Sequence, residues 1–281
     1  MVSPAKRSRK QSVNVYRQAM ISYLVESYQM IEKLLSEADF EDAFPHVFGH
    51  PNEGDARVSV RNEYGILLRK AQAHILAVHR ANKSNNLHSL AVHMRVILEC
   101  AAQVQSTAHA VCIGSERELK RVLNTSEYDF QNALISISRG KIGWNQIQEM
   151  IVSAREGIGP QGSEKPRKVR IADKIRFLTG EKEWYDHLST CFCGGEASTL
   201  AGDSFYGGVT SIDTEKDELA FAIFLDYLAE QIIKMLVGVG FLLIGANGDS
   251  QPFDDAVHLS ERKSDATQSL KDAILQRLES Q

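Results

Sequence analysis

Hydrophobic and polar positions follow helical spacing through most of this chain. Between residues 13 and 38, apolar side chains recur every three or four positions, which is typical of one face of an amphipathic helix. The same spacing predicts further helices, over residues 56–83, 115–140, 144–156, 169–179, 181–191, 214–246 and 264–278. The chain is therefore predicted to be all-α and to form a helical bundle.

The stretch over residues 85–113 stands apart because it is almost uncharged. Only Arg95 and Glu99 carry full charges there, and the other side chains are apolar, small or uncharged polar. A helix that is apolar almost all round must be buried on several sides. We therefore expect residues 85–113 to form the central helix of the bundle.

Glycine, proline and small polar residues separate the helices. Where they cluster, long loops are predicted, at about 44–55, 157–168 and 194–213. Residues 1–12 are basic and are expected to form a mobile arm. Residues 13–246 are then expected to form a single helical-bundle domain. Residues 247–281 should contain a loop and an amphipathic helix that docks on the bundle or on a partner.

A second apolar stretch, residues 219–246, raises the question of a membrane span. Its uncharged part, residues 235–246, has 12 residues, whereas a bilayer crossing needs roughly 20. Asp226, Glu230 and Lys234 recur every four residues along one line, and Glu230 before Lys234 is the favourable order for a helical ion pair. We therefore expect a core helix and no contact with a membrane.

The composition narrows the class of protein. The chain has 281 residues, 43% hydrophobic and 24% charged, with a net charge of −4. These values argue against a disordered chain and against dominant non-specific attraction to nucleic acid. The four cysteines are too few and too scattered for a disulfide framework, and no signal-peptide pattern follows the basic start. A cytoplasmic protein without a cofactor is expected.

Arg95 and Glu99 are the first candidates for function. They lie four residues apart on one helix face, which also carries His88. Arginine before glutamate is the poorer order for an intrahelical pair, so local helix stability alone does not explain the two residues. A buried guanidinium offers a planar fork of donors to a facing carboxylate or to a bound anion. A structural ion pair and a ligand site both remain open.

Polar side chains also gather before the glycine-rich segment at residue 194. Tyr185 and Ser189 precede this turn and should therefore be presented near a helix end. Together with Arg95, Glu99 and His88, they are the candidate ligand-binding residues.

The same segment holds three potential metal ligands. His187, Cys191 and Cys193 lie within seven residues. A tetrahedral zinc site needs four ligands, commonly two short-spaced pairs, and no second pair is evident. No metal site is therefore predicted, and we expect an inert helix end with buried cysteines.

These residues resemble a pattern known from bacterial proteins. Arg95-x-x-x-Glu99, followed by Tyr185 and Leu188-Ser189, is similar to a bacterial all-helical family described only as a domain of unknown function and HEPN-like in character. That family usually has a histidine a few residues after Leu-Ser. Here Cys193 stands at the expected position, so the residue best suited to acid–base chemistry is missing. The resemblance implies a helical bundle, and pairing into a homodimer.

HEPN ribonucleases carry an arginine followed after a few residues by a histidine, and Arg69 with His74 fits this spacing. A metal-independent ribonuclease needs a histidine to move protons at the 2′-hydroxyl and an arginine to hold the phosphate. RNA would then be the substrate. Arg69 and His74 lie well apart around an uninterrupted helix, which suits a shared site poorly.

Three hypotheses follow. The first is a soluble helical binding or interaction module that is not an enzyme and that recognises a protein partner or a second copy of itself. The second is a HEPN-like metal-independent ribonuclease of a defence or toxin system, with Arg69 and His74 as its candidate catalytic residues. The third is a bundle that binds a small anionic ligand at Arg95.

Overall fold

The computed structural model describes residues 4–37, 56–113, 174–175, 178, 182–193 and 214–279. This part of the chain contains six helices and no strand, which confirms the predicted all-α bundle. The helices are α1 (Pro4–Glu37), α3 (Ala56–Lys83), α4 (Leu87–Ile113), α8 (Lys182–Cys191), α10 (Thr214–Asn247) and α11 (Gln251–Glu279). The predicted loops at 44–55, 157–168 and 194–213 and the predicted helices at 115–140 and 144–156 lie outside the described residues.

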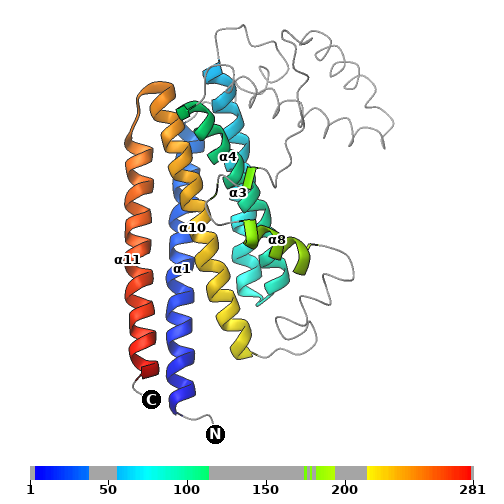
Figure 1. Cartoon of the computed structure of the whole chain (residues 1–281), viewed down its shortest axis with the longest axis vertical. Helices are drawn as coiled ribbons and strands as arrows, with labels where there is room; N and C mark the ends of the chain where they lie inside the picture. Colours follow the sequence, from blue (N-terminus) through cyan, green and yellow to red (C-terminus); the bar gives the residue numbers. More distant parts are fainter. Residues whose placement is uncertain are drawn as a thin grey trace, which may run out of the picture.

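Helices α4 and α10 form the centre of the bundle (Figure 1). Helix α10 contacts α1, α3, α4 and α11, while α4 packs between α3 and α10 and carries α8 across its N-terminal half. Along α4, the side chains of Met94, Ile97, Leu98 and Ala101 are fully buried. The near absence of charge on α4 is thus matched by burial on several sides.

Helices α3 and α4 form an antiparallel hairpin with a short connection. At its tip Asn85 has a φ of 50°, a left-handed conformation that asparagine tolerates better than most residues. The Asn86 side chain caps α4 by accepting a hydrogen bond from the Ser89 backbone N–H at 2.9 Å. Arg17 of α1 donates to the Asn82 side chain at 2.7 Å and to the Asn85 side chain at 2.8 Å. These bonds tie the hairpin tip to α1.

Helix α10 is apolar enough to be compared with a membrane span. Its segment Ala220–Ile244 has a mean hydropathy of 1.7 and sufficient length to cross a bilayer, but 67% of this window is buried inside the bundle. Glu230 and Lys234 form the ion pair expected from their spacing, with 2.8 Å between Oε1 and Nζ. Within the described residues, α10 is therefore a core helix.

The outer helices start earlier than the apolar pattern indicates. Helix α1 begins at Pro4 rather than near residue 13, and α11 begins at Gln251 rather than at residue 264. Proline suits the first turn of a helix, where Pro4 and Pro252 lie, and the lysine, arginine and glutamine residues that follow Pro4 favour helix in α1. The extension of α1 lacks a regular apolar stripe, and that of α11 carries only a short one, Phe253, Ala256 and Leu259, which the sequence analysis missed. Figure 1 shows the two chain ends at the same end of the bundle.

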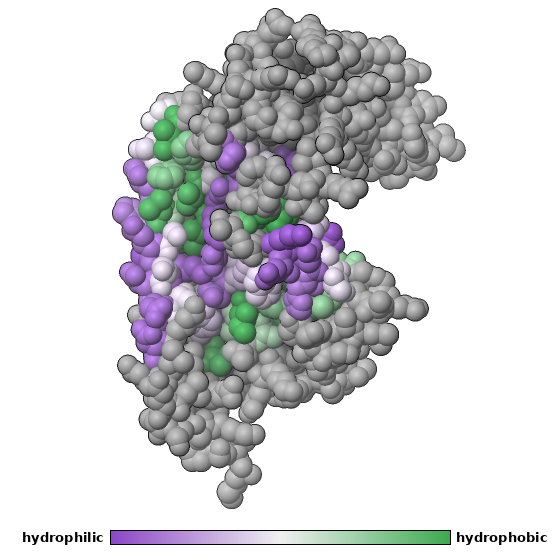
Figure 2. Space-filling model, in the orientation of Figure 1, coloured by the Kyte–Doolittle hydropathy of each residue, from purple (hydrophilic) through white to green (hydrophobic). Residues whose placement is uncertain are grey.

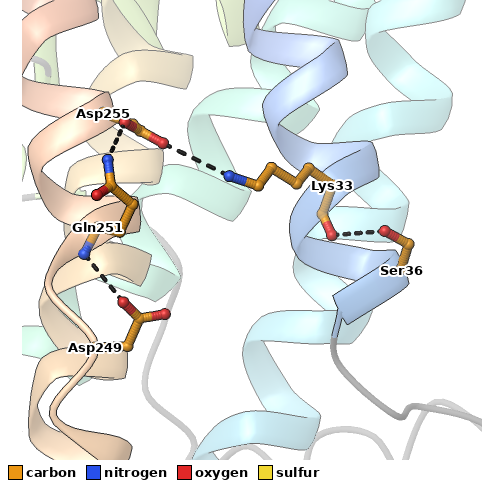
Figure 3. Close-up of polar contacts among 5 residues, drawn as sticks. All are labelled: Lys33, Ser36, Asp249, Gln251 and Asp255. Carbon is orange, nitrogen blue, oxygen red and sulfur yellow. Dashed lines mark hydrogen bonds and ion pairs between the residues drawn. The ribbon is translucent and has the colours of Figure 1, made fainter.

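A tight reversal between α10 and α11 returns the chain along the bundle. Gly248 ends α10 with a φ of 76°, which glycine adopts without strain. The Asp249 carboxylate accepts a hydrogen bond from the Gln251 backbone N–H at 3.1 Å, and the Gln251 side chain donates to Asp255 at 2.7 Å (Figure 3). Asp255 also lies 3.9 Å from the Lys33 ammonium of α1. These contacts fix the direction of α11.

The described surface over α11 is mainly hydrophilic in Figure 2, with a hydrophobic area towards its N-terminal end. Among the described residues, five large apolar side chains are exposed: Val15 and Val25 of α1, Ile66 and Leu76 of α3, and Ile223 of α10. Single apolar side chains on a surface are ordinary and do not define an interface.

Candidate functional site

The polar line of α4 meets α8 at a three-residue cluster. The Arg95 Nε lies 3.3 Å from the Glu99 Oε1, and the Arg95 Nη2 donates to the Tyr185 hydroxyl at 3.2 Å. The Tyr185 hydroxyl donates in turn to the Glu99 Oε1 at 3.4 Å. Arg95 therefore meets Glu99 and also reaches another helix. We call Arg95, Glu99 and Tyr185 the Arg95 cluster.

The Arg95 cluster lies at the edge of the bundle. The side chains of Arg95 and Glu99 are 29% and 24% exposed. Burial by itself lowers the pKa of Arg95, but hydrogen bonds with Cys193 and Tyr185 outweigh it, so the pKa is raised. The guanidinium also lies 5.2 Å from the centre of the Tyr185 ring, a cation–π contact. Arg95 is thus permanently charged and is neutralised locally by Glu99.

Helix α8 is oriented by its apolar face. Tyr185, Leu188 and Cys191 are buried and recur every three residues, which places them along one side of the helix. Trp184 stacks on Tyr227 of α10 with 4.6 Å between ring centres. Stacked aromatic pairs of this kind stabilise beyond the area they bury. The Tyr185 hydroxyl is therefore presented to α4 by packing that is independent of the charges.

The other two candidate ligand-binding residues lie outside the Arg95 cluster. His88 is exposed and its ring packs near Phe192, with 5.8 Å between the ring centres. The Ser189 hydroxyl donates to the backbone carbonyl of Tyr185 at 2.7 Å, a bond within its own helix. The structure thus brings three of the five candidates together, Arg95 included.

The three potential metal ligands of this segment, His187, Cys191 and Cys193, do not converge. His187 Nδ1 lies 3.6 Å from the Cys191 sulfur, whereas Cys193 contacts Arg95 instead. Burial raises the pKa of the Cys191 thiol and lowers the pKa of His187, so both side chains are neutral near neutral pH. Among the described residues, no group of three histidine, cysteine or acidic side chains is placed to hold a metal ion.

The two candidate catalytic residues of α3 point in different directions. Arg69 is exposed, and five residues on a helix separate it from His74 by about 140°. His74 is half-buried and faces α4, where its Nδ1 lies 2.9 Å from the Nδ1 of His93. His74 therefore contacts His93 and not Arg69.

His93 was missed by sequence analysis, although a signal for it exists. A connection as short as that between α3 and α4 forces an antiparallel hairpin, so residues at similar distances from Asn85 meet across it. Burial lowers the pKa of both histidines, and the charges of His93 and Lys70 add to this effect at His74. Both rings are therefore neutral near neutral pH.

Acidification should lower the stability of the folded protein because His74 and His93 become protonated. Both folded pKa values lie below the ordinary value of 6.5, so the folded state binds fewer protons than the unfolded state in this range. The two neutral histidines therefore contribute fully to the stability of the folded protein above pH 6.5. This contribution is lost as the pH falls through their folded pKa values. We expect the melting temperature to fall between about pH 7 and about pH 5, and to fall less in the double variant His74→Gln/His93→Gln. Thermal unfolding followed by circular dichroism measures this, and equal pH dependence in both proteins would contradict it.

Comparison of the chain with models of protein families, with curated proteins and with solved structures found no match in any of the three. The resemblance to HEPN-like bacterial helical proteins therefore stays a prediction from Arg95, Glu99, Tyr185 and Leu188-Ser189. Function must be inferred from the geometry of the described residues.

Proposed function

We propose that this protein is a helical binding module, without enzymatic activity, that recognises a protein partner at the Arg95 cluster. One observation carries the proposal. All three contacts within the cluster measure 3.2–3.4 Å, whereas charge-assisted hydrogen bonds are usually about 2.7–2.9 Å. Arg95 and Glu99 are loosely held and partly exposed, so they keep hydrogen-bonding capacity that an incoming partner can use, and the buried Tyr185 positions them.

The charges of the cluster favour a protein over a small anion. Glu99 offsets most of the positive charge by which Arg95 would attract a free anion. The pair instead presents a guanidinium donor beside a carboxylate acceptor, which complements a polar protein surface that has both donors and acceptors. Arginine and tyrosine are also the residue types that most often dominate binding energy at protein interfaces.

The proposal predicts that partner binding depends on the Arg95 cluster. The variants Arg95→Ala, Glu99→Gln and Tyr185→Phe should each weaken binding by about tenfold or more, because hot-spot residues contribute about 2 kcal/mol. Arg262→Ala is the matched control, since Arg262 forms an exposed ion pair with Glu26 on another face. Partners captured by the wild type should be identified by mass spectrometry and their affinities measured by biolayer interferometry.

Fold integrity has to be measured in the same proteins. Tyr185→Phe removes one hydroxyl and should cost only about 1 kcal/mol of stability, so its melting curve reports whether a loss of binding is a loss of fold. Unchanged affinity in all three cluster variants would show that the cluster only holds α8 on α4. RNA cleavage in EDTA that is lost in Arg69→Ala or His74→Ala would replace the proposal by the ribonuclease hypothesis.

A further inference from the structure

The histidine pair between α3 and α4 is separate from the Arg95 cluster and needs its own explanation. The two Nδ1 atoms lie 2.9 Å apart, and the ring planes are tilted by 58° with 5.0 Å between their centres. His74 and His93 come from two helices whose hairpin connection fixes their relative position. The two ring nitrogens are therefore held close together by the backbone rather than by a flexible loop.

A hydrogen bond alone explains this geometry incompletely. For two neutral rings to bond through Nδ1, one Nδ1 must carry a proton and the other must not. Neutral histidine in water prefers its proton on Nε2, so one ring would be held in its less common form. A metal ion between the rings would let both keep the Nε2 proton and present both Nδ1 lone pairs.

The distances also suit a shared metal ion. Metal–imidazole bonds to zinc are about 2.0–2.1 Å, and two of them at a tetrahedral angle place the nitrogens about 3.3 Å apart. The observed separation of 2.9 Å differs by only a few tenths of an ångström, which a small rotation of either ring supplies. Both rings are half-buried, so an ion held here would still be reached by water.

We propose that His74 and His93 together chelate one divalent transition-metal ion through their Nδ1 atoms, with water completing its coordination. Imidazole ligands suit zinc, nickel and copper. No third histidine, cysteine or acidic side chain joins the pair among the described residues, so the site is open and solvent-completed. Burial lowers the pKa of both histidines, and protons therefore compete little with the metal near neutral pH.

Lys70 provides an internal check on this proposal. It lies one turn before His74 and its charge acts on that ring. A cation at the histidine pair would be repelled by the same charge. The variant Lys70→Gln should therefore bind the metal several-fold more tightly, although Lys70 itself supplies no ligand.

Calorimetric titration of the tag-free, EDTA-treated chain with nickel or zinc chloride tests the site. We expect one binding site that His74→Gln and His93→Gln each weaken by about tenfold or more, since even outer-shell changes cost that much. His79→Gln is the matched control because His79 is another half-buried histidine of α3. His187→Gln excludes a contribution from the His187–Cys191 contact.

Two outcomes would overturn the proposal. One is metal binding that is equal in the wild type, His74→Gln and His93→Gln; the other is the absence of saturable binding. Nitrogen-15 spectra of the wild-type imidazoles give a readout that does not depend on the folding of any variant. Zinc should convert the one Nδ1-protonated ring to the Nε2-protonated form, and an unchanged spectrum would leave a plain hydrogen bond.

Discussion

Replacing Gly240 with alanine is expected to destabilise the protein by about 3 kcal/mol, the upper part of the usual cost of overpacking. A Cβ at this position would lie 2.5 Å from the Cα and 2.6 Å from the backbone nitrogen of Phe253. Both atoms belong to the first turns of α11, so no side-chain rotation can relieve the clash. Helix α11 would have to move away from α10, and this shift would also disturb the ion pair between Asp255 of α11 and Lys33 of α1 (Figure 3).

Gly238 is the matched control for this prediction. A Cβ there would lie 2.9 Å from the flexible amide end of Gln105 and from the Cγ1 of the buried Val104, so it meets side-chain atoms rather than backbone. Alanine also favours helix over glycine by about 1 kcal/mol, which offsets part of the crowding. Urea unfolding should therefore show a change within about 1 kcal/mol for Gly238→Ala and a much larger loss for Gly240→Ala. Equal stability of the two variants would mean that α11 does not pack on α10 as described.

The second large effect is expected at Lys263, which links α11 to the buried face of α10. Its side chain is only 9% exposed, and its Nζ lies 2.7 Å from Asp226 and 3.8 Å from Glu230. Tyr16 of α1 joins the same group: burial and a hydrogen bond with Asp226 raise its pKa. Polar side chains from three helices therefore meet in one partly buried network.

Removing the lysine charge should leave Asp226 without its cation. Lys263→Met keeps most of the aliphatic stem, so the expected loss of about 3 kcal/mol reports the unpaired carboxylate rather than a cavity. Adding Asp226→Asn should recover at least about 1 kcal/mol, because the two residues are coupled. Chemical unfolding of both single variants and the double variant measures this coupling.

Arg262 is the matched control, one residue earlier on the same helix. It pairs with Glu26 at an exposed position, where an ion pair contributes about 0.5 kcal/mol. Arg262→Met should therefore have little effect on unfolding. If Lys263→Met costs no more than Arg262→Met, then the Lys263 network does not hold α11 on the bundle.

The Arg95–Glu99 contact of the Arg95 cluster could be predicted from the sequence, whereas the contact with Tyr185 could not. The spacing of Arg95 and Glu99 on a buried helix is local, so their contact follows from helix geometry. The Tyr185 hydroxyl reaches Arg95 although the two residues are 90 positions apart in the chain. The sequence indicates that Tyr185 is a polar residue near a helix end. The contact of its hydroxyl with Arg95 depends on how α8 packs on α4.

Among the metal and ribonuclease candidates, too, contacts within one helix follow from the sequence, whereas contacts between helices do not. His187 and Cys191 meet because four residues make one helical turn, but Cys193 follows the end of α8 and contacts Arg95. The sequence pattern pairs His74 with Arg69 as candidate catalytic residues. In the structure, His74 instead contacts His93 across the α3–α4 hairpin. Residues five apart diverge around a helix, while residues on facing helices converge.

The sequence by itself determined the all-α class, the extents of α3 and α10 and the central place of α4, but not where α1 and α11 begin, because apolar periodicity and caps act within a few residues. It predicted α3 over residues 56–83, and it predicted α10 to within one residue of its observed end. Only the tertiary structure decided which polar side chains meet: Tyr185 with Arg95, His93 with His74, and Lys263 with Asp226. Such pairs form only when separate helices pack against one another, and that packing is set mainly by the apolar faces of the helices rather than by the polar side chains beside them.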